Sequence, residues 1–169
     1  MGTISALERP MLRTTVSLRL PASISDVWRT YADFGEVQDW SPLVARSYLT
    51  SQGVEGVGMS RHCDLLPRGA VEETIVVWEP DTRMVVRVEP AGPIASQEIT
   101  MTFEGGAKET TVRMTADIEL RSEAADRAAQ ISDTFQTILR STLAGLRHYL
   151  VTGESVDEGT ALSEEGLGD

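Results

Sequence analysis

Residues 97–120 read QEITMTFEGGAKETTVRMTADIEL, and this stretch decides the fold. Apolar and polar residues alternate along it on both sides of the Gly105-Gly106 pair. A period of two is typical of a β-strand with one buried face, and two glycines between such runs favour a hairpin. The residues expected on the buried face are Gln97, Ile99, Met101, Phe103, Val112, Met114, Ala116, Ile118 and Leu120.

The segment that follows, residues 122–151, predicts one long helix. Residues at steps of three and four form one broad, mostly apolar stripe, as expected for a helix that covers a core. They are Ala128, Ile131, Phe135, Ile138, Leu139, Thr142, Leu146 and Leu150. At about 1.5 Å per residue, such a helix is roughly 45 Å long, enough to cross a whole sheet.

Upstream of the hairpin, the sequence predicts five more strands and two short helices. A helix is expected over 24–33 and a second, shorter one over 36–40. Alternation predicts the strands over 12–20, 46–51, 57–65, 71–78 and 84–88. Short loops between consecutive strands favour an antiparallel meander, whose apolar face needs a cover. The sequence therefore predicts an α+β fold in which one antiparallel sheet is covered by the long C-terminal helix.

Length and charge limit the class of protein. With 169 residues, 41% of them hydrophobic and 24% charged, the chain fits one soluble globular domain. The net charge is −11, from 15 basic and 26 acidic residues, and Lys108 is the only lysine. Phosphate binding needs clustered Lys and Arg, so no nucleic-acid partner is expected. We expect a flexible N-terminus over 1–10, a folded domain over 11–152 and a disordered, acidic tail over 153–169.

Membrane, metal and disulfide sites find no support in the sequence. No apolar run approaches the roughly 18–20 residues of a membrane span, so no integral membrane association is expected. The first twenty residues also lack the apolar block of a secretory signal. The single cysteine, Cys63, has no partner for an internal disulfide, which fits a cytoplasmic location. Neither His62 nor His148 stands in a metal-binding pattern, and neither a metal nor an organic cofactor is predicted.

Three short segments resemble a known family: Ser25-Asp26-Val27-Trp28, Asp39-Trp40-Ser41-Pro42 and Gly58-Met59-Ser60-Arg61. With the order of the elements, they make residues 11–152 resemble the START-like (SRPBCC) helix-grip superfamily, in particular its polyketide cyclase/dehydrase and lipid-transport type. The resemblance implies a seven-stranded antiparallel sheet curved around a long C-terminal helix, with two short helices after the first strand. It also implies an apolar cavity that binds lipids, hormones, polyketides or aromatic compounds. Some members only carry the ligand, and others cyclise or dehydrate it.

Arg61 and Glu73 are the candidate catalytic residues, because both share the parity of the expected buried face. If residues 65 and 70 pair, Arg61 lies near Thr74, next to Glu73. Buried charges are costly, so they are normally paired or used. Arg61 would donate hydrogen bonds to a ligand carbonyl or phenolate, while Glu73 orients Arg61 or moves a proton. The alternatives are an ion pair that fixes the strand register, or a solvated pair if the parity is misjudged.

The expected cavity wall is formed by further residues of the same face and of the long helix. The candidate ligand-binding residues are Trp40, Met59, Met84, Gln97, Met101, Phe103, Met114, Phe135, Leu139 and Thr142. Flexible thioethers suit an adaptable pocket, but methionine is also an ordinary core residue. Trp40 either closes one end of the cavity or packs a short helix onto the sheet.

Two classes of function are open on this basis. The first is binding of a hydrophobic or aromatic small molecule, lipid- or polyketide-like, with or without a cyclase or dehydratase reaction. The second is a non-catalytic protein-interaction module of the same fold. The sequence identifies neither the ligand nor the oligomeric state, and a homodimer is left open.

Overall fold

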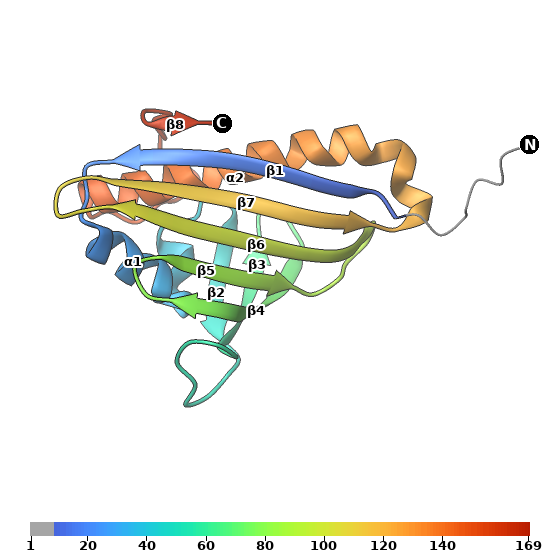
Figure 1. The fold of residues 1–169 in the computed structure, drawn as a ribbon, viewed down its shortest axis with the longest axis horizontal. Coiled ribbons are helices and arrows are strands. Elements are labelled where there is room, and N and C mark those ends of the chain that lie inside the picture. The colour runs from blue at the N-terminus through green and yellow to red at the C-terminus, as the bar shows by residue number, and fades with distance from the viewer. Residues whose placement is uncertain (1–8) are drawn as a thin grey trace, which may run out of the picture.

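The alternating segments form one antiparallel sheet, whose strands run side by side in Figure 1. The structure is a computed structural model that describes residues 9–169. The strands are β1 (Met11–Leu20), β2 (Val44–Leu49), β3 (Ser60–Leu65), β4 (Ala70–Glu79), β5 (Arg83–Val88), β6 (Ile94–Gly105), β7 (Thr110–Leu120) and β8 (Leu167–Gly168). Their order across the sheet is β2-β3-β4-β5-β6-β7-β1-β8. The fold is α+β as predicted, with eight strands in the sheet where seven were expected.

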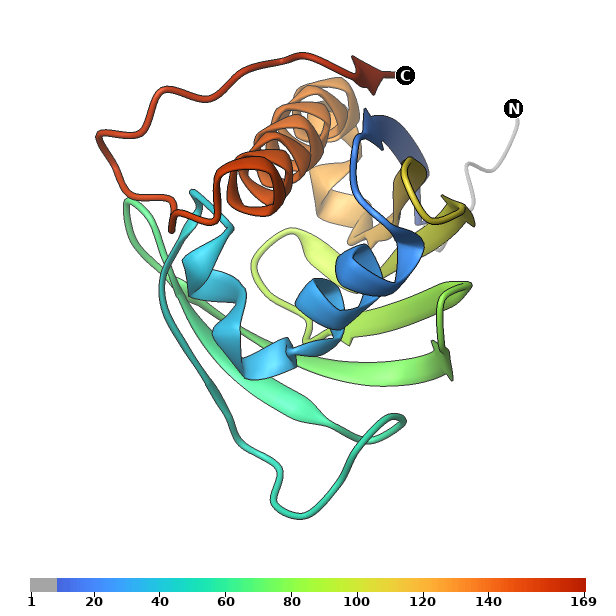
Figure 2. The ribbon, with the colours of Figure 1, turned by 90° about the vertical axis from the view of Figure 1, so that its left-hand side faces the viewer.

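The helical segments occur where the sequence predicts them. They are α1 (Ile24–Ala32), the 3-10 helices η1 (Phe34–Asp39) and η2 (Ser122–Arg127), and α2 (Ala128–Thr152). The Ser23 hydroxyl accepts the Asp26 N–H at 3.2 Å and caps α1. The predicted helix over 122–151 is a regular α-helix only from Ala128 onward, because η2 forms its first turns. The sheet curves around α2, and α1 and η1 lie across one end of the space between them (Figure 2).

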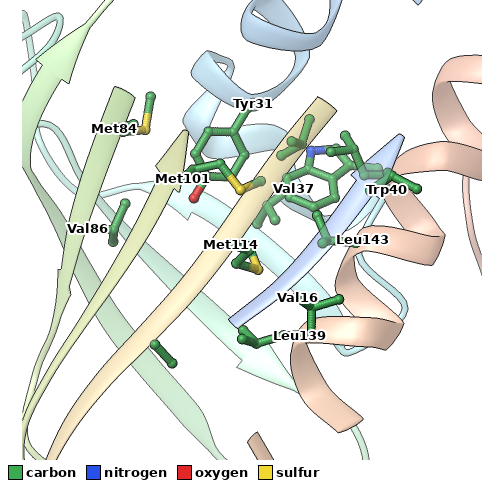
Figure 3. Close-up of a cluster of buried hydrophobic side chains, with 14 of the residues drawn as sticks. Val16, Tyr31, Val37, Trp40, Met84, Val86, Met101, Met114, Leu139 and Leu143 are labelled. Atoms are coloured by element: carbon green, nitrogen blue, oxygen red, sulfur yellow. The ribbon is translucent and has the colours of Figure 1, made fainter. Parts of the chain in front are cut away.

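The concave face of the sheet and the inner face of α2 form the core, as the alternation predicts. Met84, Met101 and Ile118 on the sheet are fully buried. Figure 3 shows the labelled methionines of three neighbouring strands and the rings of Tyr31 and Trp40 converging in this core. The buried apolar residues of α2 include Phe135, Leu139, Leu143 and Leu146.

The register of the β3–β4 hairpin differs by one residue from the predicted one. The Leu65 N–H donates to the Gly69 carbonyl at 2.8 Å, and Ala70 pairs with Asp64, not with Leu65. Arg61 therefore lies directly opposite Glu73. The reason is the turn, which takes up one more residue than the predicted pairing allowed. Alternation defines the face of a strand but not the length of its turn.

The segment after α2 differs from the disordered tail that its composition predicts. It runs back across α2 and ends at β8, which pairs with β1 (Figures 1 and 2). Val156 is 7% exposed, and its N–H donates to the Asp39 carbonyl at 2.8 Å. Backbone pairing and burial thus offset the acidic composition. The N-terminus expected to be flexible lies outside the described residues up to position 8.

Candidate ligand-binding cavity

A cavity of about 130 Å³ lies between the sheet and α2. Its wall is mainly apolar, with polar groups from β3, β4, β6 and α2. A dry apolar cavity of about 150 Å³ holds one benzene molecule, so this volume suits a single ring. Of the predicted site residues, those on the wall are Trp40, Arg61, Glu73, Gln97, Met114, Phe135, Leu139 and Thr142.

The other four predicted residues, Met59, Met84, Met101 and Phe103, lie in the packed core and not on the cavity wall. Phe103 packs edge-on against Trp28, with ring centroids 5.4 Å apart. The parity placed these side chains inward, as observed, but the aromatic residues of α1 fill the space beside them. Met59, Met84 and Met101 therefore take the alternative that the sequence left open for methionine, which is core packing. For Phe103 the prediction of a place on the cavity wall is wrong, because its ring packs against Trp28 in the core.

Arg61 and Glu73 form an ion pair across one rung of the β3–β4 ladder. The Arg61 Nε donates to Glu73 Oε2 at 2.6 Å, and Nη2 lies at 2.6 Å from the same oxygen. The Arg61 Nη1 donates to the Phe34 carbonyl at 2.9 Å, and its guanidinium stacks 3.9 Å from the centroid of the Phe34 ring. Four contacts thus hold the guanidinium in one position, with only 6% of the Arg61 residue exposed.

Arg61 of this pair stays charged although it is buried. Burial is the largest influence and opposes the charge on Arg61, but the Glu73 carboxylate together with Cys63 and Tyr31 outweighs it, and the pKa of Arg61 is raised. Within residues 9–169, Glu73 Oε1 accepts no hydrogen bond, although Glu73 lies on the cavity wall. The pair therefore offers the cavity a fixed cation and one free carboxylate oxygen.

Tyr31 of α1 is a cavity residue that the sequence analysis assigned to no site. It is 3% exposed and lines the cavity beside Trp40, with ring centroids 5.8 Å apart. Its hydroxyl forms no hydrogen bond in the part of the chain that the structure describes. Burial raises the pKa of Tyr31, Arg61 lowers it less and Glu73 adds to the rise, so the phenol stays protonated. Its inward position on α1 is the only signal in the sequence, and that position does not distinguish core from cavity.

The remaining polar groups of the wall differ in whether they already have hydrogen-bond partners within the protein. The Thr142 hydroxyl donates to the Ile138 carbonyl at 2.8 Å, so its proton is already used. The Gln97 amide has no hydrogen-bond partner among residues 9–169 and is free to bind a ligand. Burial raises the pKa of the Cys63 thiol to about 11, which leaves it neutral and a poor nucleophile.

A close approach to α2 brings Trp40 to the cavity. A Cβ on Gly145 would lie 2.2 Å from the Trp40 carbonyl and 2.7 Å from Pro42 Cδ. Only glycine at position 145 therefore lets the loop after η1 rest on α2. The indole Nε1 of Trp40 is buried, with no hydrogen-bond partner in the described chain.

A metal site and a membrane-spanning helix each place specific requirements on residues 9–169. No cluster of three or more His, Cys, Asp or Glu residues could hold a metal ion within the described chain. No helix there is both long and apolar enough to cross a bilayer.

A curved antiparallel sheet that closes on a long helix around a cavity defines the helix-grip class of proteins. The family described as polyketide cyclase / dehydrase and lipid transport matches residues 11–151, and the chain belongs to this family. No curated protein matches the chain.

Several solved structures have the same fold at low sequence identity. XoxI from Bacillus cereus is 20% identical with a TM-score of 0.70, over 83% of this chain and 96% of that one. The di-domain ARO/CYC BexL from the BE-7585A biosynthetic pathway is 17% identical with a TM-score of 0.70, over 81% of this chain and 45% of that one. DynU16 from the dynemicin biosynthetic locus is 24% identical with a TM-score of 0.57, over 86% of this chain and 48% of that one. This chain thus spans about half of the two biosynthetic proteins.

Proposed function

We propose that this protein binds a small hydrophobic or aromatic molecule that carries an oxygen atom, in the cavity between the sheet and α2. The observation that carries the proposal is the buried Arg61–Glu73 pair on a mainly apolar wall. Apolar residues of similar volume would serve stability at least as well as a buried ion pair. The pair is therefore better explained by a ligand oxygen than by folding.

The polar groups of the wall determine which chemical groups the ligand needs. Arg61 is held by Glu73 and Phe34, and its free N–H groups suit an acceptor such as a carbonyl or phenol oxygen. The Tyr31 hydroxyl, on α1, supplies a second donor. The description of the family, which names polyketide and lipid ligands, supports a hydrophobic body for the molecule.

Phenol is a suitable probe, because it combines one aromatic ring with one oxygen. Thr142→Leu fills the cavity from α2 without changing a charge and is expected to weaken phenol binding at least about tenfold. Thr134→Leu is the matched control, because Thr134 is exposed on the same helix and also donates to the carbonyl four residues earlier. Calorimetry that gives equal phenol affinities for both variants would overturn the proposal.

Tyr31→Phe tests the polar contact separately. One hydrogen bond is worth about 0.5–1.5 kcal/mol, so the variant should bind phenol roughly 2- to 12-fold more weakly. Benzene, which has no oxygen, should bind both proteins equally. A matching loss for benzene would mean that Tyr31 only shapes the cavity.

A proton-transfer reaction on the bound molecule is a second candidate function. It is favoured by the meeting of a protonated phenol, a carboxylate and a guanidinium at one wall, Tyr31, Glu73 and Arg61. Arg61 would stabilise an enolate oxygen, while Glu73 moves a proton, as a cyclase or dehydratase requires. Native mass spectrometry of the purified protein, followed by extraction, would identify a retained molecule for a turnover test. The cytoplasmic location stays a prediction, and a homodimer stays open.

A further inference from the structure

Residues 154–169, here called the C-terminal strap, cross the outer side of α2 (Figure 2). The first anchor of the strap is at η1. Val156 is 7% exposed, and its N–H donates to the Asp39 carbonyl at 2.8 Å. Asp39 immediately precedes Trp40, which lines the cavity. The start of the strap is thus fixed to the segment that closes one side of the cavity.

The second anchor is a pair of arginines on α2. Arg147 lies 3.1 Å from Glu165, and Arg140 lies 3.5 Å from Glu164 and 3.6 Å from Asp169. The acidic partners are exposed, so these ion pairs are weak and sensitive to salt. They attach the strap to the outer face of the helix whose inner face lines the cavity.

The third anchor is the edge of β1. The Arg19 N–H donates to the Gly166 carbonyl at 2.9 Å, and Leu167 pairs with Leu18. Gly166 has φ of +80°, and a Cβ there would lie 2.1 Å from the Arg19 carbonyl. Only glycine fits this position, so the strap docks in one defined register.

Together the anchors connect α2 to the segment after η1, the two sides of the cavity that would have to separate to admit a larger ligand. The cavity of about 130 Å³ accepts a single ring, whereas sites for drug-sized molecules measure about 300–1,000 Å³. The segment after η1 packs directly on α2 at Gly145, and both line the cavity. The strap is anchored to both of them and to β1. We propose that the C-terminal strap holds the cavity closed, and that its release from β1 and α2 admits bulkier hydrophobic molecules. This inference rests on the proposed function, since it concerns access to the same cavity.

Gly166→Ala is the variant that tests the strap. It leaves every cavity residue unchanged but places a methyl group against the Arg19 carbonyl. Gly159→Ala is the matched control, because a Cβ there meets only Asp157 Oδ1 at 3.5 Å, an ordinary contact. Hydrogen exchange of the Arg19 amide reports docking of the strap, and should be at least about tenfold faster in Gly166→Ala only.

Two probes of different size report access. Phenol fits the closed cavity, and its affinity should be the same in all three proteins. The larger dye anilinonaphthalene sulfonate, which has a naphthalene and a phenyl ring, does not fit, and should associate about tenfold faster with Gly166→Ala than with the wild type or Gly159→Ala. Salt should speed association with the wild type, because it screens the arginine anchors. Displacement by phenol would show that the dye occupies the same cavity.

The outcomes separate the two proposals. Faster Arg19 exchange with unchanged dye association would overturn the strap proposal and leave the proposed function intact. Unchanged Arg19 exchange in Gly166→Ala would also overturn the strap proposal, because Gly166 would then not anchor the strap. If neither probe binds any of the three proteins, the proposed function fails, and the strap proposal fails with it.

Discussion

Two neighbouring rungs of the β3–β4 ladder carry opposite charges across the strands, one on each face of the sheet. Arg61 faces Glu73 on the concave side, and His62 faces Glu72 on the convex side. The side chains of the inner pair are 8% and 15% exposed, while the outer ones are 19% and 50% exposed. The inner cation stacks on Phe34, whereas the outer ring stacks on Tyr48 at the surface.

The contrast shows how burial changes the dependence of stability on an ion pair. Near water, both groups of a pair remain solvated when it breaks, so little stability depends on it. Inside the protein, a charge that loses its partner has no water to replace it, so breaking the pair is costly. The inner pair thus makes folding depend on both partners.

The largest expected effect comes from breaking the inner pair. Glu73→Gln leaves the Arg61 charge buried and unpaired and should cost about 3–5 kcal/mol of unfolding free energy. That loss corresponds to a fall in melting temperature of about 6–20 °C. Urea unfolding of Glu73→Gln and of the control Glu72→Gln gives the comparison directly. Equal losses in the two variants would show that Arg61 is solvated.

Replacing the whole inner pair sharpens the comparison. The double variant Arg61→Met with Glu73→Leu keeps the volume and removes both charges. Its stability should return to within about 2 kcal/mol of the wild type, since buried pairs can be exchanged for apolar residues. Phenol affinity should nevertheless fall at least about fivefold, because the hydrogen-bonding guanidinium is gone. Full stability with unchanged phenol binding would assign the pair a purely structural role.

The faces of the strands could be predicted from the sequence, but not the pairing across the turn. Alternation correctly placed Arg61 and Glu73 on the inward side, because side-chain direction has a period of two. The number of residues in the turn at Leu65–Gly69 depends on local backbone geometry, which carries no periodic signal. The register consequently differed by one residue, and Arg61 lies opposite Glu73 and not Thr74.

Which inward residues border the cavity could not be predicted either. Met101 and Met114 are paired on the inward face of the sheet, yet only Met114 lies on the cavity wall. The difference depends on the volumes of side chains brought together from distant segments, such as Phe103 and Tyr31. The docking of the C-terminal strap could not be predicted for a similar reason, because it depends on Arg140, Arg147 and the β1 edge. No local pattern in an acidic segment reveals such partners.

The residue on the next inward rung, Cys63, gives a smaller effect. Burial raises the pKa of its thiol to about 11, although Arg61 partly opposes this. An unfolded thiol ionises near 9.0, so stability should fall as pH rises from there to about 11, where the folded thiol also ionises. Iodoacetamide should react far more slowly with the native protein than with urea-unfolded protein at pH 9. Equal rates would mean that Cys63 is accessible.

The smallest effect is expected from the outer rung. The two ring nitrogens of His62 donate to the carboxylates of Glu72 and Asp64, and these hydrogen bonds raise the pKa of His62. The bond to His62 in turn lowers the pKa of Asp64. A protonated His62 is favoured in the folded state, so its contribution is fully present below its ordinary pKa of 6.5 and is lost as pH rises through the raised value.

Asp64 sets the lower limit, since its contribution is lost as pH falls through its lowered pKa, below the ordinary 3.8. His62→Gln should therefore lower the melting temperature most between about pH 4 and 6.5, by about 2 °C or less. The difference from the wild type should vanish in alkaline solution. Melting curves of His62→Gln across this range provide the measurement. A pH-independent loss would show that His62 acts by stacking on Tyr48 and not by its charge.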